Sequence, residues 1–529
     1  MSQQWWQREV IYQIYPRSFQ DSNSDGIGDL RGIIDRIDYL CWLGVKAVWL
    51  SPIYPSPMAD FGYDISNYTD IDPVFGSLSE FDTLVAEMHR RGLKLIMDLV
   101  PNHTSDMHPW FRDSRSARTS ARRNWYIWGD PAPDGGPPNN WLSEFGGPAW
   151  TFDPGSGQYY YHAFLRQQPD LNWREPQVRA ALHDVMRFWL DRDVDGFRVD
   201  AIHFLLEDES LADNPPNPSW QPGQSPARRL LRTHTADLPE VQVHVKGMRQ
   251  VADEYQDRVL IGEAYLPISR MVHYYGDCLS GFHLPFNFHL IRTRWNARAI
   301  ASLIGEYEAA LPPGGWPNWV LGNHDKPRLA TRLGGRSQAR MAALLLLTLR
   351  GTPTLYNGDE IGMVDGVIHR NEVRDPWEKN APGIGLGRDP CRTPMQWSRA
   401  PAAGFTQGQP WLPIGDNAFD CNVLTQTADP HSLLSFYRQL IELRQRESSL
   451  TLGAYRLLEV TDQLLIFERS LEARRLIVAL NFSGEAQPVS LADPGPVLLS
   501  THADLRLPTG GRVESLAAYE GLIVRPGLH

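Results

Sequence analysis

The sequence lacks a long apolar run and a secretion leader, two features that would tie the chain to a membrane. The longest apolar run, residues 341–349, contains Thr348 and is too short to cross a bilayer. The first ten residues contain no basic segment followed by an apolar stretch, so we expect no signal peptide. These absences predict a cytoplasmic protein that has no membrane partner.

Positive charge and cysteine are also scarce. The chain has 51 Lys and Arg against 62 Asp and Glu, which gives a formal net charge of −11. Such a surface repels phosphate backbones, so we do not expect a nucleic-acid partner. The few cysteines form no CxxC pair, which argues against a zinc site or a disulfide framework. We expect buried free thiols in a reducing compartment at Cys41, Cys278, Cys391 and Cys421.

Short apolar runs alternate along the chain with longer amphipathic segments. Such alternation is typical of a parallel sheet covered by helices. We expect strands near residues 11–15, 47–51, 93–100, 196–200, 259–264, 283–287, 319–323 and 354–356, with helices over 30–43 and 78–91. Eight strands in one series favour an α/β fold of the (β/α)8 TIM-barrel type.

Two interruptions and one change of pattern divide the chain. Residues 104–171 are rich in Gly, Pro, Asn and Trp and predict a loop-rich subdomain inserted after strand 3. We therefore place the barrel in residues 1–103 and 172–450, with a second insertion at about 207–240. Residues 451–529 carry short alternating strands, which predict a C-terminal antiparallel β domain, a β-sandwich.

Acidic residues end several of the predicted strands. Asp98, Asp200, Glu263 and Asp325 all occupy this position. Any one of them alone would be better explained as a helix cap or a solvated carboxylate. Because barrel enzymes place their chemistry at the carboxyl ends of the strands, we expect all four to face one pocket. Glycoside hydrolysis uses such a pair, one as general acid and one as base or nucleophile.

Arg198 precedes Asp200 by two residues. On a strand this spacing puts both side chains on one face. A guanidinium fixed there would keep Asp200 ionised, as a nucleophile requires. A purely structural ion pair would have the same geometry.

Four separated motifs resemble those of glycoside hydrolase family 13, the α-amylase family. They are residues 98–103, residues 196–200, Glu263 and residues 323–325, and they occur in the family's order. The resemblance covers nearly the whole chain. It implies a retaining enzyme in which Asp200 is the nucleophile, Glu263 is the acid/base and Asp325 is the third carboxylate. It also implies that His103 and His324 bind the same sugar.

Residues 168–172 and 392–397 further resemble the oligosaccharide α-glucosidase group of that family. The resemblance implies that Asp64 and Arg392 pair across the pocket floor, so that the enzyme acts on chain ends. It places Tyr63 under the terminal glucose and makes Phe145 and Phe164 pocket-wall aromatics, a role that competes with core packing. In this group Ala after the nucleophile, here Ala201, goes with α-1,4 rather than α-1,6 linkages.

An acidic loop follows the first predicted strand. Oxygen-bearing residues at alternate positions resemble the start of a calcium loop, although the twelfth-position acid of an EF-hand is absent. The family's glucosidases hold Ca²⁺ or Mg²⁺ here, which implies a structural divalent cation; the alternative is an Asx-rich turn without metal. We expect no organic cofactor. The implied ligands are Asp21, Asn23, Asp25, Asp29 and the carbonyl of Ile27.

The leading hypothesis is a retaining, exo-acting α-glucosidase. It would hydrolyse short α-glucosides such as maltose and transfer glucosyl units to alcohol acceptors, as a monomer or homodimer. One alternative is an isomerase of the same family, of the trehalose or isomaltulose synthase type. A more remote alternative is a non-catalytic relative that serves a membrane transporter. That relative would carry a transmembrane anchor and would have lost catalytic carboxylates, which this chain keeps.

Overall fold

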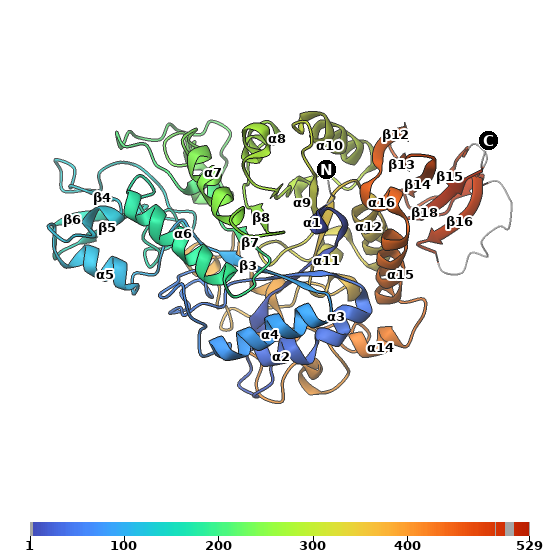
Figure 1. The fold of residues 1–529 in the computed structure, drawn as a ribbon, viewed down its shortest axis with the longest axis horizontal. Helices are drawn as coiled ribbons and strands as arrows, with labels where there is room; N and C mark the ends of the chain where they lie inside the picture. Colours follow the sequence, from blue (N-terminus) through green and yellow to red (C-terminus); the bar gives the residue numbers. More distant parts are fainter. Residues whose placement is uncertain (1–3, 492–493, 503–512, 528–529) are drawn as a thin grey trace.

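The computed structural model describes residues 4–491, 494–502 and 513–527. Parts of the N-terminal segment and of the predicted C-terminal domain thus lie outside the described residues. The main sheet has eight parallel strands whose neighbours follow in chain order, as predicted for a (β/α)8 barrel (Figure 1). They are β1 (Ile11–Ile14), β2 (Ala47–Leu50), β3 (Lys94–Leu99), β7 (Gly196–Val199), β8 (Val259–Gly262), β9 (Leu284–Pro285), β10 (Asn318–Val320) and β11 (Thr352–Tyr356).

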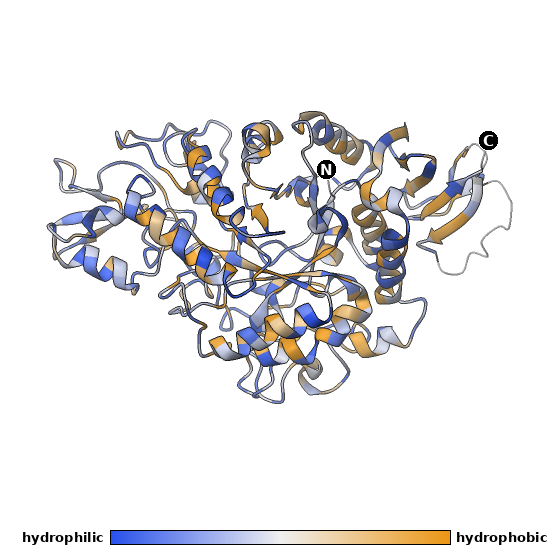
Figure 2. Ribbon diagram, in the orientation of Figure 1, coloured by the Kyte–Doolittle hydropathy of each residue, from blue (hydrophilic) through white to orange (hydrophobic). Residues whose placement is uncertain are grey.

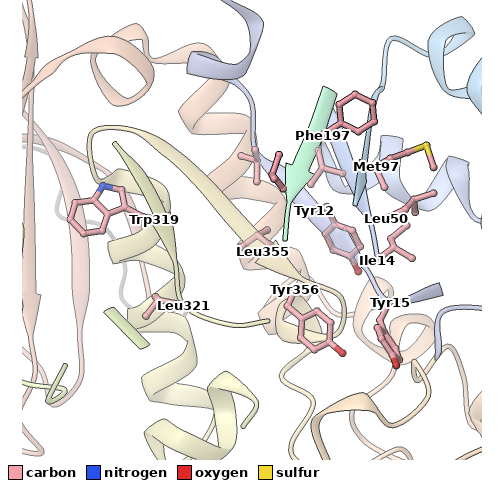
Figure 3. Packing of buried hydrophobic residues seen from close by; sticks show 14 of the residues in the cluster. Tyr12, Ile14, Tyr15, Leu50, Met97, Phe197, Trp319, Leu321, Leu355 and Tyr356 are labelled. Atoms are coloured by element: carbon pink, nitrogen blue, oxygen red, sulfur yellow. The ribbon is translucent and has the colours of Figure 1, made fainter. Parts of the chain in front are cut away.

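Alternation along the strands separates two apolar cores. In β2, Ala47 and Trp49 belong to a cluster inside the barrel, whereas Val48 and Leu50 belong to a larger cluster under the helices. Figure 3 shows members of the larger cluster, among them Leu50, on neighbouring strands. The same alternation directs every second residue of β3 and β7 into the barrel, and this sets up the site described below.

Helices cover the outside of the barrel and present mixed faces, apolar toward the strands and polar toward solvent (Figure 2). The segment predicted as one helix over 30–43 divides at Arg36, whose φ of −108° and ψ of 5° leave the helical region. Helices of six or more residues that follow barrel strands are α2 (Leu30–Asp35), α3 (Ile37–Leu43), α4 (Leu78–Arg90), α6 (Pro176–Leu190), α7 (Val241–Ala252), α10 (Ala297–Ala310), α12 (Arg336–Thr348) and α15 (Leu433–Arg446). Among the described residues, no helix is both long enough and apolar enough to cross a membrane.

Both interruptions of the alternation are loop-rich, as their composition predicts. The first carries α5 (Pro109–Ser116) and a three-stranded sheet of β4 (Trp128–Gly129), β5 (Trp150–Asp153) and β6 (Gln158–Tyr161). The second, between β7 and α7, contains only short 3₁₀ turns such as η4 (Pro226–Arg229). Shorter helices elsewhere are α1 (Trp5–Arg8), α8 (Ile268–Met271), α9 (His289–Arg292), α11 (Leu329–Leu333), α13 (Pro376–Asn380), α14 (Val423–Thr427) and α16 (Ser448–Leu452).

The C-terminal region forms an antiparallel sheet that lies beside the barrel (Figure 1). Its five strands run in the order β12 (Ala454–Val460), β13 (Leu464–Leu471), β14 (Arg474–Asn481), β18 (Gly521–Pro526) and β16 (Pro494–Ser500). A separate pair, β15 (Gln487–Pro488) and β17 (Ser515–Leu516), shares an apolar cluster with the large sheet. All four cysteines are free; Cys391 and Cys421 are buried as expected, whereas Cys41 is half-buried and Cys278 is exposed.

Candidate active site

A cavity of about 390 Å³ opens at the carboxyl ends of the barrel strands. Asp200 follows β7, Glu263 follows β8 and Asp325 lies beyond β10, and all three line this cavity. Asp98 does not line it. Its position inside β3 directs the side chain into the barrel, where it is 1% exposed. The expectation that four strand-end acids face one pocket is therefore correct for three of them.

Arg198 holds the carboxylates together from behind the cavity. Its Nη1 donates to Asp98 Oδ1 at 2.7 Å and to Asp200 Oδ1 at 2.5 Å. Its Nη2 lies 2.8 Å from Glu263 Oε1. The guanidinium does not line the cavity, so it positions the acids rather than the substrate.

Three carboxylates around one guanidinium leave negative charge in excess. Burial raises the pKa of Asp98 to about 7, against the opposing charge of Arg198. Burial likewise raises the pKa of Asp200 well above its usual value; Arg198 opposes this effect, whereas Glu263 and Asp98 add to it. Arg198 opposes the rise of the Asp200 pKa, as predicted, but burial and the two neighbouring carboxylates outweigh it. Titration in such a crowded cluster belongs to the group rather than to one member.

Glu263 has a second anchor at the end of the neighbouring strand β7. The backbone N–H of Ala201 donates to Glu263 Oε2 at 2.9 Å. Ala201 adopts a left-handed conformation with φ of 46°, which is uncommon for a residue other than glycine. Both oxygens of Glu263 are thereby fixed, and Ala201 itself borders the cavity.

Asp325 lies in a different electrostatic environment. Its Oδ1 accepts from Arg392 Nη2 at 2.9 Å and lies 3.5 Å from Arg388 Nη1. Burial opposes its ionisation, but the surrounding positive charges lower the pKa of Asp325 far below its usual value. Burial also lowers the pKa of His324 and keeps that ring neutral, so the two arginines supply the charge.

The predicted pair across the pocket floor, Asp64 with Arg392, does not form. Each residue of the pair that does form lies four positions earlier in the chain. Asp64 accepts from Ser56 Oγ and from two backbone amides, and it has no contact with Arg392. The pair that lines the cavity is Asp60 with Arg388, at 2.6 Å between Oδ1 and Nη2.

Asp375 also pairs with Arg388: its Oδ1 lies 2.7 Å from the same Nη2. Asp60, Asp375 and Arg388 are all at most 6% exposed, so the ion-pair network closes one end of the cavity.

The predicted aromatic and histidine residues divide between the cavity and the layer behind it. Tyr63, His103, Phe145 and Phe164 line the cavity. His324 lies behind Tyr63, stacked on that ring at an interplanar angle of 4° and joined to its hydroxyl at 2.7 Å. Burial lowers the pKa of His103 to about 3, so the ring is neutral at physiological pH.

Several cavity residues had no counterpart among the sequence predictions. Phe204, Tyr265 and Trp377 add aromatic surface, and a set of cations lies toward the mouth. These residues belong to loops that carry no periodic pattern, and only proximity to a motif could have pointed to them.

The acidic loop after β1 folds on itself. Asp21 accepts from the backbone amides of Asn23, Ser24 and Gly26, and Asp29 caps α2 through Gly32. Asn23 and Asp25 form similar short turns with Asp25 and Ile27. Within the described ranges, no three acidic, histidine or cysteine side chains are close enough together to hold a metal ion. The predicted ligand set also includes the Asn23 side chain and the carbonyl of Ile27, and the structural cation stays a prediction.

Comparison with known proteins agrees with this geometry. The profile described as "Alpha amylase, catalytic domain" matches residues 13–453. The chain is 42% identical to a protein of Rhizobium meliloti strain 1021 named "Probable alpha-glucosidase", over 91% of this chain and 90% of that one. It is 37% identical to the oligo-1,6-glucosidase of Halalkalibacterium halodurans, over 95% and 96% of the two chains.

Two solved structures extend the likeness to the whole fold. The α-glucosyl transfer enzyme XgtA superposes with a TM-score of 0.94 at 39% identity, covering 99% of this chain and all of that one. The trehalulose synthase MutB of Pseudomonas mesoacidophila MX-45 gives a TM-score of 0.91 at 33% identity, with the same coverage. The chain is a glycoside hydrolase and belongs to the α-amylase family, family 13.

Proposed function

We propose that this enzyme is a retaining, exo-acting α-glucosidase of short α-glucosides. The observation that carries the proposal is the placement of Asp200 and Glu263 on one guanidinium, with both carboxylates open to a cavity closed at its far end. Binding to the two nitrogens of one guanidinium holds the two carboxyl groups near each other, and retaining glycosidases use such a close pair as nucleophile and acid/base.

The two acids then have different tasks. Asp200 attacks the anomeric carbon while Glu263 gives its proton to the departing oxygen, and a glucosyl ester forms on Asp200. Glu263 next takes a proton from water or an alcohol, which attacks the ester and releases glucose or a new glucoside. Glu263 suits the acid/base task because both of its oxygens are held at the cavity, one by Arg198 and one by the backbone N–H of Ala201. Asp325, ionised beside two arginines, accepts hydroxyl hydrogens of the bound glucose.

The shape of the cavity supports exo action. Because Asp60 and Arg388 fill its far end, the chain of a longer glucan has no exit beyond the terminal glucose. Neutral His103 and the ring of Tyr63 supply a hydrogen bond and an apolar face to that sugar.

Linkage and acceptor preferences extend the proposal. The small side chain of Ala201 leaves room beside the acid/base, and we propose a preference for α-1,4 substrates such as maltose. Transglucosylation to alcohols follows from the covalent intermediate. Action in the cytoplasm, as a monomer or homodimer, stays a prediction.

The likeness to a trehalulose synthase keeps the isomerase as a second candidate. An isomerase must hold the released sugar until it attacks again. In the stretch directly after Asp325, residues 326–328, only Lys326 lines the cavity; Arg328 is 1% exposed and donates to the carbonyl oxygen of Asn357. Incubation with sucrose separates the two: free glucose and fructose indicate hydrolysis, whereas an isomeric disaccharide as main product indicates isomerisation.

Chemical rescue tests the assigned roles. Asp200→Ala should be inactive on 4-nitrophenyl α-glucoside, and added azide should yield β-glucosyl azide, because azide then attacks directly from the nucleophile's face. Glu263→Ala should instead yield α-glucosyl azide, since the intermediate still forms on Asp200. Exchanged anomers would reverse the assignment, and a β-configured first product from the wild-type enzyme would refute retention.

A further inference from the structure

Four cations line the active-site cavity away from its closed end. Arg228 belongs to η4, Arg292 ends α9, Lys326 follows Asp325, and Arg232 lies just beyond η4. They come from three separate loops of a protein whose overall charge is −11.

Two of the four reach solvent at the mouth. Asp60 and Arg388 at the far end are 4% and 6% exposed, whereas Arg228 and Arg292 are exposed and Arg232 and Lys326 are half-buried. A glucose held between the catalytic acids and the closed end would thus direct its aglycone toward these cations.

Most of these charges have no carboxylate partner. Arg232 forms an ion pair with Glu144. In the described part of the chain, no acidic side chain forms an ion pair with Arg228, Arg292 or Lys326.

Two of the unpaired cations share one aromatic ring. Arg292 and Lys326 lie 5.0 Å and 5.4 Å from the centre of the Tyr265 ring, which stacks on Phe288. The ring attracts both cations and so gathers two like charges around one side chain, where they repel each other unless an anion is bound.

The cations also act on one another. Although the side chain of Arg292 reaches solvent, the walls of the mouth partly desolvate it and lower its pKa; the charges of Arg228 and Arg232 lower it further, against the attraction of Tyr265. Burial likewise lowers the pKa of Lys326; Asp325 opposes this effect and Arg292 adds to it. Asp325 and Glu263 attract Lys326, but Asp325 is already shared with two arginines, and no carboxylate is among the main charges that act on Arg292.

We propose that the mouth of the cavity binds an anionic aglycone, so that the enzyme prefers α-glucosides whose leaving group carries a carboxylate or phosphate. The inference rests on the proposed function and names its substrate class. The bond that breaks joins the anomeric carbon to the aglycone oxygen. The aglycone leaves as its alcohol with the proton of Glu263, and water restores that proton. An alcohol bearing the same anion is the matching acceptor in transfer.

Paired substrates test the preference without changing leaving-group chemistry. The 4-carboxyphenyl and 4-carbamoylphenyl α-glucosides have similar shape but differ in charge, and maltose can be compared with maltose phosphorylated on its reducing glucose. We expect kcat/KM to favour one anionic member by about tenfold or more, where tenfold corresponds to 1.4 kcal/mol. A preference within the phenyl pair indicates carboxylate binding, and a preference within the maltose pair indicates phosphate binding. Equal kcat/KM in both pairs would overturn the inference.

Substitution of the cations tests whether they cause the preference for an anionic aglycone. Arg292→Gln and Lys326→Gln should each lower the anionic-to-neutral ratio of kcat/KM several-fold. The matched control is Arg229→Gln. Arg229 neighbours Arg228 in η4 but does not line the cavity, so the anionic-to-neutral ratio of kcat/KM of this variant should equal that of the wild type. A ratio unchanged in both test variants would refute the assignment. No turnover of the neutral glucosides would instead refute the proposed function itself.

Discussion

Asp60 offers the sharpest test of how the pocket recognises a terminal glucose. Its Oδ1 is committed to Arg388 at 2.6 Å, whereas Oδ2 has only a long 3.4 Å contact with Gln168 and remains available to a sugar hydroxyl. Asp60→Asn keeps the shape and removes the charge. Loss of one charge-assisted hydrogen bond costs about 1.5–3 kcal/mol, which predicts a fall in kcat/KM of about 10- to 150-fold.

The fold should survive this change, because Arg388 keeps Asp375, with contacts of 2.7 and 3.0 Å. The assay is kcat/KM for maltose and 4-nitrophenyl α-glucoside, with the melting temperature measured alongside. Asp64→Asn is the control, since Asp64 is equally buried but faces backbone amides instead of the cavity. A larger loss of kcat/KM in Asp64→Asn than in Asp60→Asn would refute the reasoning and restore the pairing predicted from the sequence.

Three further changes have defined outcomes. Glu263→Gln should lower kcat for maltose by about 10²- to 10⁴-fold and for 4-nitrophenyl α-glucoside much less, because nitrophenolate leaves without a proton; equal losses would exclude Glu263 as the acid. Ala201→Val places a branched side chain at a φ of 46° beside Glu263, so the maltose-to-isomaltose ratio of kcat/KM should fall, and an unchanged ratio would remove the linkage argument. Adding Ca²⁺ after EDTA treatment should leave the melting temperature unchanged if hydrogen bonds from Asp21 and Asp29 suffice; a rise with concentration would support the structural cation.

The barrel and the three cavity acids could be predicted because each prediction rested on a period or on a topological rule. Alternation of strand and helix patterns indicated eight strands, including the two-residue β9, whose predicted position was correct. Asp200, Glu263 and Asp325 follow strand ends, and parallel strands of a barrel bring those ends together. Asp98 differs because it lies within β3, where alternation directs it inward.

The ion pair that closes the cavity could not be chosen from the sequence. Asp60 and Asp64 lie in one short turn region, and Arg388 and Arg392 lie around a single 3₁₀ turn. Neither segment has a helical or strand period, so residue spacing does not indicate which member of each pair faces the cavity. The mouth cations Arg228, Arg292 and Lys326 were missed for the same reason, since each belongs to a different loop.

The roles of the acids depend on how many guanidinium groups surround each carboxylate, and the order of the motifs in the sequence does not give that number. Around Arg198, three carboxylates share one guanidinium, and the pKa values of Asp98 and Asp200 rise. Around Asp325, two guanidinium groups meet one carboxylate, and its pKa falls. Three carboxylates around one guanidinium thus favour a protonated group, whereas Asp325 stays ionised and accepts hydrogen bonds. The number of arginines within reach of each carboxylate therefore separates the acids into two electrostatic environments.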